Sequence, residues 1–254
     1  MKTSLKITDK SKNYIYPILT FIIILIVWQL VVEYKEIPQY ILPTPIDIIK
    51  VFISDYKVLF ANIKVTLYES ICGFILALVS AMFLGVIMDF VSIIRKCLYP
   101  ILLVSQTIPT ITIAPLLIIW FGFDTLPKIL MVNLTCFFPI LINFVDGLEN
   151  IDKDYLNLFE TMKSTKLKTF FHLKLPMSLD KLFSGVKISA TYMVVAATVA
   201  EWLGGTEGLG VYMVRSKSAY ALDKVFASTI IVVILSLIFV GIVDILRKVI
   251  IRHK

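Results

Sequence analysis

The sequence predicts an all-α integral membrane protein with about six transmembrane helices, and three observations indicate this fold class. Hydrophobic residues make up 58% of the 254 residues and charged residues only 17%, whereas soluble domains are about 45–50% apolar and about 25% charged. The mean hydropathy is +0.89. The apolar residues are gathered into runs of the roughly 20 residues that cross a hydrocarbon core of about 30 Å.

Hydropathy divides the chain into apolar spans separated by polar connections. We expect spans at about Ile15–Tyr34, Ile63–Met88, Leu98–Trp120, Ile129–Asp146, Gly185–Leu203 and Val225–Leu246. The first run has no small-residue cleavage site after it, so we interpret it as a retained anchor rather than a signal peptide. The whole chain, 1–254, is expected to form a single transmembrane domain.

The distribution of Lys and Arg predicts the orientation of the chain in the membrane. With the N-terminus in the cytoplasm, cytoplasmic segments hold sixteen Lys and Arg and outer segments hold eight. Cytoplasmic connections normally carry this excess. We therefore expect a multi-pass protein of the plasma or inner membrane, with segment 1–14, stretch 148–182 and the C-terminus in the cytoplasm. The same arrangement explains the net charge of +7 without a nucleic-acid partner.

Motifs for catalysis and for cofactor binding are missing from the sequence. No glycine is followed by lysine, which excludes the GxxxxGK[ST] loop that binds ATP. The two histidines, His172 and His253, lie outside any HExxH motif, and no GxSxG motif occurs. Cys72, Cys97 and Cys136 show no CxxC spacing that would indicate a zinc site or a disulfide framework. We expect a protein that is not an enzyme and has no cofactor and no metal.

Prolines and polar residues within the spans are candidates for the lining of a solute path. Pro109 and Pro115 each remove a backbone hydrogen bond from the third span. A broken helix is tolerated at membrane depth where protein or a water-filled cavity satisfies the freed groups. The polar candidates are Gln106, Asn133 and Glu201. Each candidate also has an interpretation without a solute path. The prolines would merely kink the helix, the amides would form hydrogen bonds between helices, and the Glu201 side chain would reach the membrane interface.

Two connections expected on the outer side have local signals of their own. Thr44 and Pro45 predict the N-cap and the first residue of a short amphipathic helix on the outer surface. The stretch GGTEGLGVY, residues 204–212, holds four of the ten glycines. Because glycine permits positive φ and close backbone approach, we expect a tight, packed turn there, with a plain loop as the alternative.

The polar stretch 148–182 predicts two short amphipathic helices. The first set of apolar residues recurs on one helical face and consists of Tyr155, Leu158, Phe159 and Met162. Asp152 or Asp154 can start that helix. The second set consists of Leu167, Phe170 and Phe171, and Pro176 is expected to end the run. Such helices are suited either to a lipid surface or to docking a partner.

This stretch resembles the cytoplasmic EAA loop of ABC-importer permeases, whose pattern runs from an EAA triplet through a glycine to an I-x-L-P end. Residues 173–176, LKLP, match that end. The alignment places Lys163 at the glycine position and Asn157 at the acid position, so both of those residues are replaced. A non-glycine residue in a left-handed conformation costs about 1–2 kcal/mol. The remaining matches to the pattern are Thr161, Ser164 and Phe170.

Other stretches extend the resemblance over nearly the whole chain, from about Ile37 onward. ILPTPIDII, TIPTITIAPLLIIWFGF, FFPILINFVDG and AEWLGGTEGLGVYM are similar to permeases of the nitrate, sulfonate and taurine type. The last stretch, together with SKSAYALDKVFA, is most similar to permeases for thiamine-pyrimidine precursors.

The resemblance implies the permease subunit of a binding-protein-dependent ABC importer, with a cytoplasmic coupling loop between the fourth and fifth helices. It implies cytoplasmic ABC ATPase subunits that hydrolyse ATP, an extracytoplasmic solute-binding protein, and a second permease copy, commonly in a homodimer. The small-molecule solute would be nitrate-, sulfonate- or taurine-like, or a thiamine-pyrimidine precursor. The implied ATPase-coupling residues are Tyr155, Leu158, Phe159, Met162, Lys163, Ser164 and Pro176. The alternatives are a stand-alone secondary transporter or channel, and a membrane scaffold or lipid enzyme.

Overall fold

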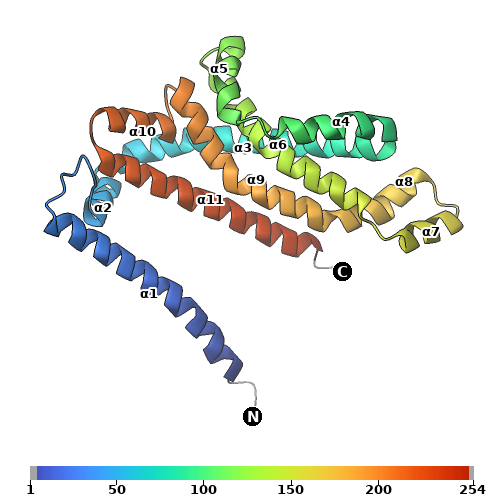
Figure 1. Ribbon diagram of the computed structural model, residues 1–254, viewed down its shortest axis with the longest axis horizontal. Coiled ribbons are helices and arrows are strands. Elements are labelled where there is room, and N and C mark those ends of the chain that lie inside the picture. The colour runs from blue at the N-terminus through green and yellow to red at the C-terminus, as the bar shows by residue number, and fades with distance from the viewer. Residues whose placement is uncertain (1–4, 252–254) are drawn as a thin grey trace. The chain divides into compact units, whose positions relative to one another are not determined.

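The computed structural model describes the backbone of residues 5–251 and the side chains of residues 15–251 (Figure 1). Every regular element in this range is a helix, which confirms the all-α fold class. In chain order the elements are α1 (Leu5–Tyr34), α2 (Pro45–Ser54), α3 (Tyr56–Phe90), α4 (Ser92–Ser105), α5 (Thr110–Phe121), α6 (Thr125–Glu149), α7 (Lys153–Thr161), α8 (Lys166–Thr169), the π-helical turn η1 (Phe170–Lys174), α9 (Leu175–Gly204), α10 (Leu209–Ser218) and α11 (Leu222–Ile251). The expectation for segment 1–14 falls on residues whose side chains are not described.

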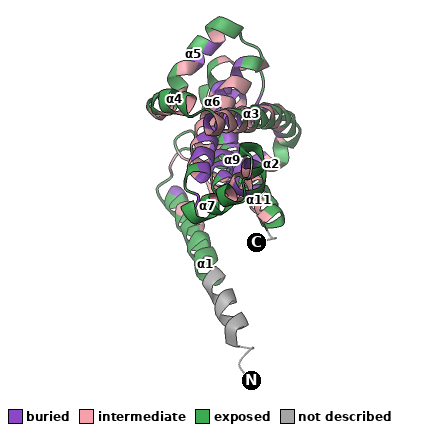
Figure 2. Ribbon diagram, turned by 90° about the vertical axis from the view of Figure 1, so that its right-hand side faces the viewer, coloured by how far each residue is buried: buried purple, intermediate pink, exposed green. Residues whose placement is uncertain are grey.

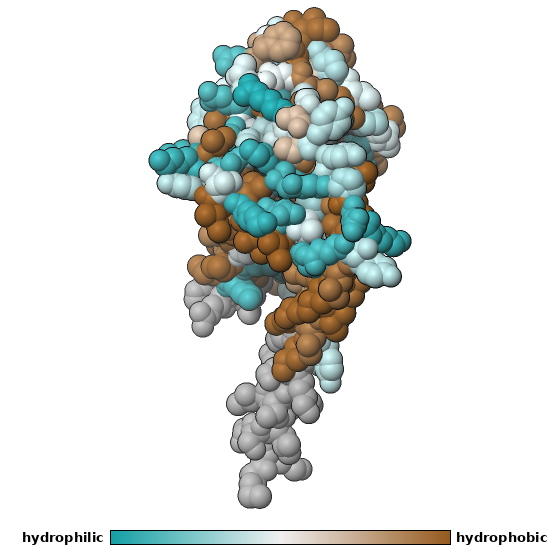
Figure 3. All heavy atoms as spheres, turned by 90° about the vertical axis from the view of Figure 1, so that its left-hand side faces the viewer, coloured by the Kyte–Doolittle hydropathy of each residue, from teal (hydrophilic) through white to brown (hydrophobic). Residues whose placement is uncertain are grey.

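Within the described residues, five helical stretches are long and apolar enough to cross a membrane, and there are six when the bent pair α4–α5 is counted as one span. The five are Ile15–Tyr34, α3, α6, the continuous run Lys166–Gly204, and α11. Five or six candidate spans agree with the expectation of about six transmembrane helices. Figure 3 shows the described side chains of α1 as a nearly continuous apolar surface, as expected of a helix that faces lipid.

The third span is broken rather than kinked. Helices α4 and α5 meet at an angle of 101°, and Figure 1 shows this sharp corner between them. Pro109 is the N-cap of α5, and a residue before proline is disfavoured in the helical region. By contrast, α5 continues through Pro115. The break therefore lies at the first of the two prolines.

The fifth span begins earlier than expected, and Pro176 does not end the helical run before it. The run continues without a gap from Lys166 to Gly204. Proline cannot donate the hydrogen bond of a regular α-helix, and its ring clashes with the carbonyl four residues earlier. The turn Phe170–Lys174, which ends two residues before Pro176, is π-helical, and the Leu175 N–H donates to the Phe170 carbonyl. This wider turn accommodates the proline, so the prediction of a stop at Pro176 was wrong.

The described chain groups into two compact units, of which the first contains the described residues up to 59 and residues 213–229. Helix α2 begins as predicted, because the Thr44 hydroxyl accepts a hydrogen bond from the Asp47 N–H at 3.2 Å. The Thr44 hydroxyl also donates to the Asp47 carboxylate, and this bond, together with Lys50, lowers the pKa of Asp47. The resulting negative charge lies in the first turn of α2, where it interacts favourably with the positive end of the helix dipole.

The start of α11 is tied to other parts of the same unit. The Lys224 ammonium lies 2.7 Å from the Asp55 carboxylate, directly after α2. The Phe226 ring packs against the Trp28 ring of α1 with centroids 5.7 Å apart. These two contacts connect α1, α2 and the beginning of α11.

The second unit, which contains 60–212 and the described residues from 230 to 251, is centred on the packing of α6 along α9. Figure 2 shows that buried residues concentrate on these two helices. The Ser189 hydroxyl donates to the Cys136 carbonyl at 2.8 Å. A Cβ atom at Gly185 would lie 2.4 Å from the Pro139 carbonyl oxygen. The helices therefore approach so closely that only a glycine fits at this crossing.

We expect Gly185→Ala to destabilise the protein by about 1–3 kcal/mol, because the added methyl group overpacks the α6–α9 contact. Gly241→Ala in α11 is the matched control, since a Cβ there meets no atom within 4 Å. This control should be neutral or stabilising by up to about 1 kcal/mol, because alanine favours a helix over glycine. The measurement is thermal unfolding of both variants in detergent, and equal midpoints would contradict the packing argument.

Candidate functional site

Helix α7 places the first apolar set of the polar stretch on its surface. The Asp152 carboxylate accepts a hydrogen bond from the Asp154 N–H at 3.0 Å and caps the helix. Tyr155, Leu158 and Met162 are 50%, 54% and 70% exposed. Phe159 is half-buried. The predicted helix is confirmed, and most of its apolar face is exposed.

Helix α7 ends in a Schellman motif, and Lys163 occupies the position where glycine is usual. The Lys163 N–H donates to the Glu160 carbonyl at 2.9 Å, and the Ser164 N–H donates to the Phe159 carbonyl at 3.0 Å. Lys163 has a φ of 53°, which is the left-handed region. The lysine therefore adopts the backbone conformation of the glycine that it replaces, at a cost of about 1–2 kcal/mol.

We expect Lys163→Gly to stabilise the end of α7 by up to about 1 kcal/mol, since relief of the strain is partly offset by the greater entropy of an unfolded glycine. The measurement is hydrogen–deuterium exchange of the Lys163–Ser164 region, which should slow in the variant. Lys153→Gly, at the start of the same helix, is the control and should speed exchange there. Faster exchange at the end of α7 in Lys163→Gly would contradict the strain argument.

The segment around α7 and α8 is held to the end of α3. The Lys174 ammonium lies 2.6 Å from the Asp89 carboxylate, and the Phe170 and Phe90 rings have centroids 5.2 Å apart. A groove of about 300 Å³ lies there, lined by Asp89, Phe90, Leu156, Glu160, Ser164, Lys166, Thr169 and Lys174. Sequence reasoning missed Asp89, although an acid at the end of a span was a usable signal.

A second groove, of about 340 Å³, opens at the break between α4 and α5. Its lining is Gln106, Thr107, Ile108, Pro109, Thr110, Leu134, Thr135, Phe138, Pro139 and Tyr192. The structure thus brings together two of the predicted pathway residues, Gln106 and Pro109. Pro115 lies within α5 and Asn133 is half-buried on α6, both outside this lining. Sequence reasoning missed Tyr192, which reaches the groove from α9.

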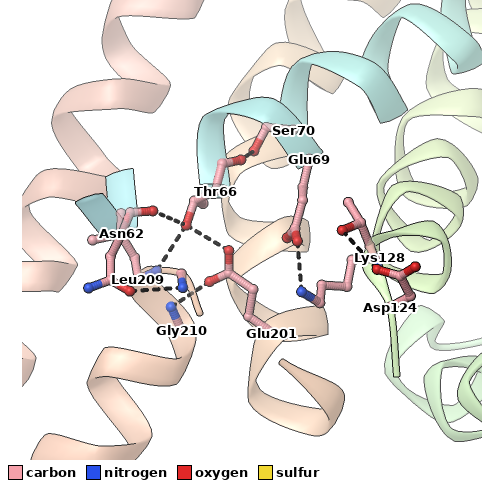
Figure 4. Close-up of polar contacts among 11 residues, drawn as sticks. Asn62, Thr66, Glu69, Ser70, Asp124, Lys128, Glu201, Leu209 and Gly210 are labelled. Atoms are coloured by element: carbon pink, nitrogen blue, oxygen red, sulfur yellow. Dashed lines mark hydrogen bonds and ion pairs between the residues drawn. The ribbon is translucent and has the colours of Figure 1, made fainter. Parts of the chain in front are cut away.

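Glu201 lies in a buried polar cluster rather than in this groove (Figure 4). Glu201 is only 1% exposed. One carboxylate oxygen accepts a hydrogen bond from the Thr66 hydroxyl at 2.6 Å, and the other accepts one from the Gly210 N–H at 2.6 Å. The Thr66 hydroxyl in turn accepts from the Leu209 N–H at 2.9 Å. Glu201 therefore joins α3 and α9 to the start of α10.

The glycine-rich stretch folds over this cluster, and the predicted tight turn is found at 205–208, whereas Leu209–Tyr212 already belong to α10, a helix that the sequence did not predict. Gly208 has a φ of 114°, and its N–H donates to the Asn62 side-chain oxygen at 2.8 Å. A Cβ atom at Gly208 would lie 2.2 Å from a carboxylate oxygen of Glu201. Both the backbone conformation and the contact with Glu201 require glycine here.

Glu69 and Lys128 form a buried ion pair beside this cluster (Figure 4). The Lys128 ammonium lies 2.8 Å from a Glu69 carboxylate oxygen, and the two side chains are 7% and 0% exposed. The pair joins α3 to the first turn of α6. Removal of charges from water is costly, and their mutual attraction offsets that cost only while both are present.

We expect Lys128→Met to destabilise the protein by about 3–5 kcal/mol, because it leaves the Glu69 carboxylate buried without a counter-charge. The double variant Glu69→Gln/Lys128→Met should recover a substantial part of that loss, since it leaves no unpaired charge. Thermal unfolding of the wild type, both single variants and the double variant makes a complete thermodynamic cycle. Strictly additive losses would contradict the ion pair as a coupled unit.

Comparison with known proteins identifies the family. The pattern of the "Binding-protein-dependent transport system inner membrane component" family matches residues 73–252. A "Probable ABC transporter permease protein" of Haemophilus influenzae is 33% identical, over 87% of this chain and 90% of its own. The formylaminopyrimidine transport permease of Halalkalibacterium halodurans is 33% identical, over 90% of this chain and 92% of its own.

A solved structure supports the same fold. A chain of a methionine ABC transporter in inward-facing conformations matches with a TM-score of 0.67 at 17% identity, over 77% of this chain and 97% of that one. With the apolar helices described above, this similarity indicates a multi-pass membrane protein with a permease fold. The chain belongs to the family of binding-protein-dependent transport system inner membrane components and is a permease subunit of such an ABC importer.

Proposed function

We propose that two copies of this chain form the membrane pathway of the importer, and that ATP hydrolysed on separate subunits drives transport through segment 148–182. The observation that carries this proposal is the apolar face of α7, where Tyr155, Leu158 and Met162 remain exposed. Apolar side chains on an otherwise polar helix are suited to a groove in a partner protein. The Lys174–Asp89 ion pair can transmit a force on this segment to α3.

The orientation that this role requires agrees with the charge distribution. Segment 148–182 carries six of the lysines assigned to the cytoplasmic side, as expected for a cytoplasmic connection. Both termini then lie in the cytoplasm, and GGTEGLGVY and α2 lie on the outer side, where a solute-binding protein delivers its cargo. The single permease domain, 1–254, stays a prediction.

The groove at the break in the third span is our candidate for part of the solute path. Gln106 and Pro109 line it, and irregular backbone at membrane depth is tolerated where it lines a cavity. The buried, hydrogen-bonded Glu201 is better suited to positioning the turn 205–208 than to contacting solute. The solute is a small molecule of the nitrate, sulfonate and taurine class or a thiamine-pyrimidine precursor. The relative that is a formylaminopyrimidine permease supports the second class.

We expect Leu158→Glu/Met162→Glu to abolish both co-purification of the ATPase subunits and ATP-dependent uptake, because charge on the apolar face of α7 opposes its burial in a partner. The matched control is Lys153→Glu, which at about 3.6 residues per turn lies on the side of α7 opposite Met162. The measurement is pull-down of the ATPase with the tagged permease, alongside the amount of permease inserted in the membrane.

Two outcomes would contradict the proposal. One is a double variant that retains its ATPase at the level of the control. The other is a purified permease that moves solute into liposomes without any ATPase, which would favour a stand-alone transporter.

A further inference from the structure

The groove between α4 and α5 is polar but carries no formal charge. Among the described residues that line it, none is Asp, Glu, Lys, Arg or His. Its polar side chains are an amide and four hydroxyl groups, from Gln106, Thr107, Thr110, Thr135 and Tyr192. An anion placed there would lose water without gaining a cation, which is costly in a site of low dielectric constant.

The hydrogen-bonding groups of the groove can serve a ligand as both donors and acceptors. The Thr107 hydroxyl donates to the Val104 carbonyl at 2.7 Å, and the Thr135 hydroxyl donates to the Met131 carbonyl at 2.9 Å. Because their protons are used, these two oxygens are left as acceptors. Within the described residues the Gln106 amide and the Tyr192 hydroxyl have no protein partner, so both can donate and accept.

The helix ends at the break add partial charges of both signs. Helix α4 ends at Ser105, directly before the lining residue Gln106, and α5 begins at the lining residue Thr110. A helix carries about half a positive charge at its N-terminus and about half a negative charge at its C-terminus. The two ends therefore offset each other, and the groove has no strong preference for an ion of either sign.

Two aromatic side chains complete the lining. Phe138 comes from α6 and Tyr192 from α9, and Tyr192 is 51% exposed. Aromatic rings favour offset or edge-on contact with another ring, which adds about 0.5–1.5 kcal/mol beyond the area that is buried. The groove thus offers ring faces together with neutral donors and acceptors.

We propose that this groove recognises an uncharged heteroaromatic ring with hydrogen-bonding edges, of the aminopyrimidine kind, and disfavours small anions such as nitrate and sulfonates. The inference rests on the proposed pathway and decides between the two solute classes left open there. Gln106 and Tyr192 are the specificity-determining residues, and Phe138 provides the stacking surface.

The test measures direct contact of solute with the permease–ATPase complex in the absence of the binding protein. Saturation-transfer NMR is recorded with formylaminopyrimidine and, separately, with taurine, with sodium nitrate as a competitor. We expect a signal from the pyrimidine ring protons, no comparable signal from taurine, and no displacement by nitrate. Gln106→Leu and Tyr192→Phe should each weaken the interaction about tenfold, since each removes a hydrogen bond of about 1 kcal/mol or slightly more.

Tyr34→Phe is the matched control, because Tyr34 is 90% exposed and lies outside the groove. This control should leave the ring-proton signal unchanged. A taurine signal as strong as that of the pyrimidine, displacement of the pyrimidine by nitrate, or a pyrimidine signal that Gln106→Leu and Tyr192→Phe do not reduce would overturn the inference. Co-purification of the ATPase is measured on the same samples. Loss of the ATPase would contradict the proposed function, whereas a retained ATPase with one of the three outcomes above would contradict only the specificity of the groove.

Discussion

Buried polar groups in this protein must find their hydrogen-bond partners within the protein itself, and this requirement determines how its helices pack. Glu201 satisfies its two oxygens with the Thr66 hydroxyl and the Gly210 N–H, and Glu69 pairs with Lys128. Hydrocarbon offers no hydrogen bonds, so each partner must come from another helix. These contacts tie α3 to α6, α9 and the start of α10. They also explain why the turn over Glu201 contains Gly208, because the Cβ of any other residue there would overlap the Glu201 carboxylate.

Two residues of the polar segment that follows α6 occupy positions that do not suit their residue type. Lys163 takes a left-handed conformation that suits glycine, and the Schellman hydrogen bonds at the end of α7 hold it there. Pro176 sits near the start of α9, and the π-helical turn before it keeps the helix continuous. The same turn places Phe170 against Phe90 and Lys174 against Asp89. A strained but anchored segment of this kind presents α7 to a partner while remaining connected to α3.

Local signals predicted local structure well, because they act over a few residues. The Thr44 cap, the Asp152 cap and the break at Pro109 follow from hydrogen bonding and sterics near each residue. The prediction that Pro176 ends the helical run was wrong, because a π-helical turn before the proline lets the helix continue and the rule used for proline does not include this case. The partners of Glu201 were not predictable, since Thr66 lies far from it in the chain and no periodicity connects them.

The class of the molecule can be read from the amino-acid sequence, because the apolar runs, the positions of Lys and Arg, and the LKLP end of the polar stretch together indicate a permease of an ABC importer. Which polar side chains act together became clear from the packing of the helices. It placed Glu201 in a closed cluster, paired Glu69 with Lys128, and brought Gln106 and Tyr192 to one groove. The physical reason is that hydrophobic length is encoded along the chain, whereas hydrogen bonds and ion pairs between helices depend on which faces pack against each other.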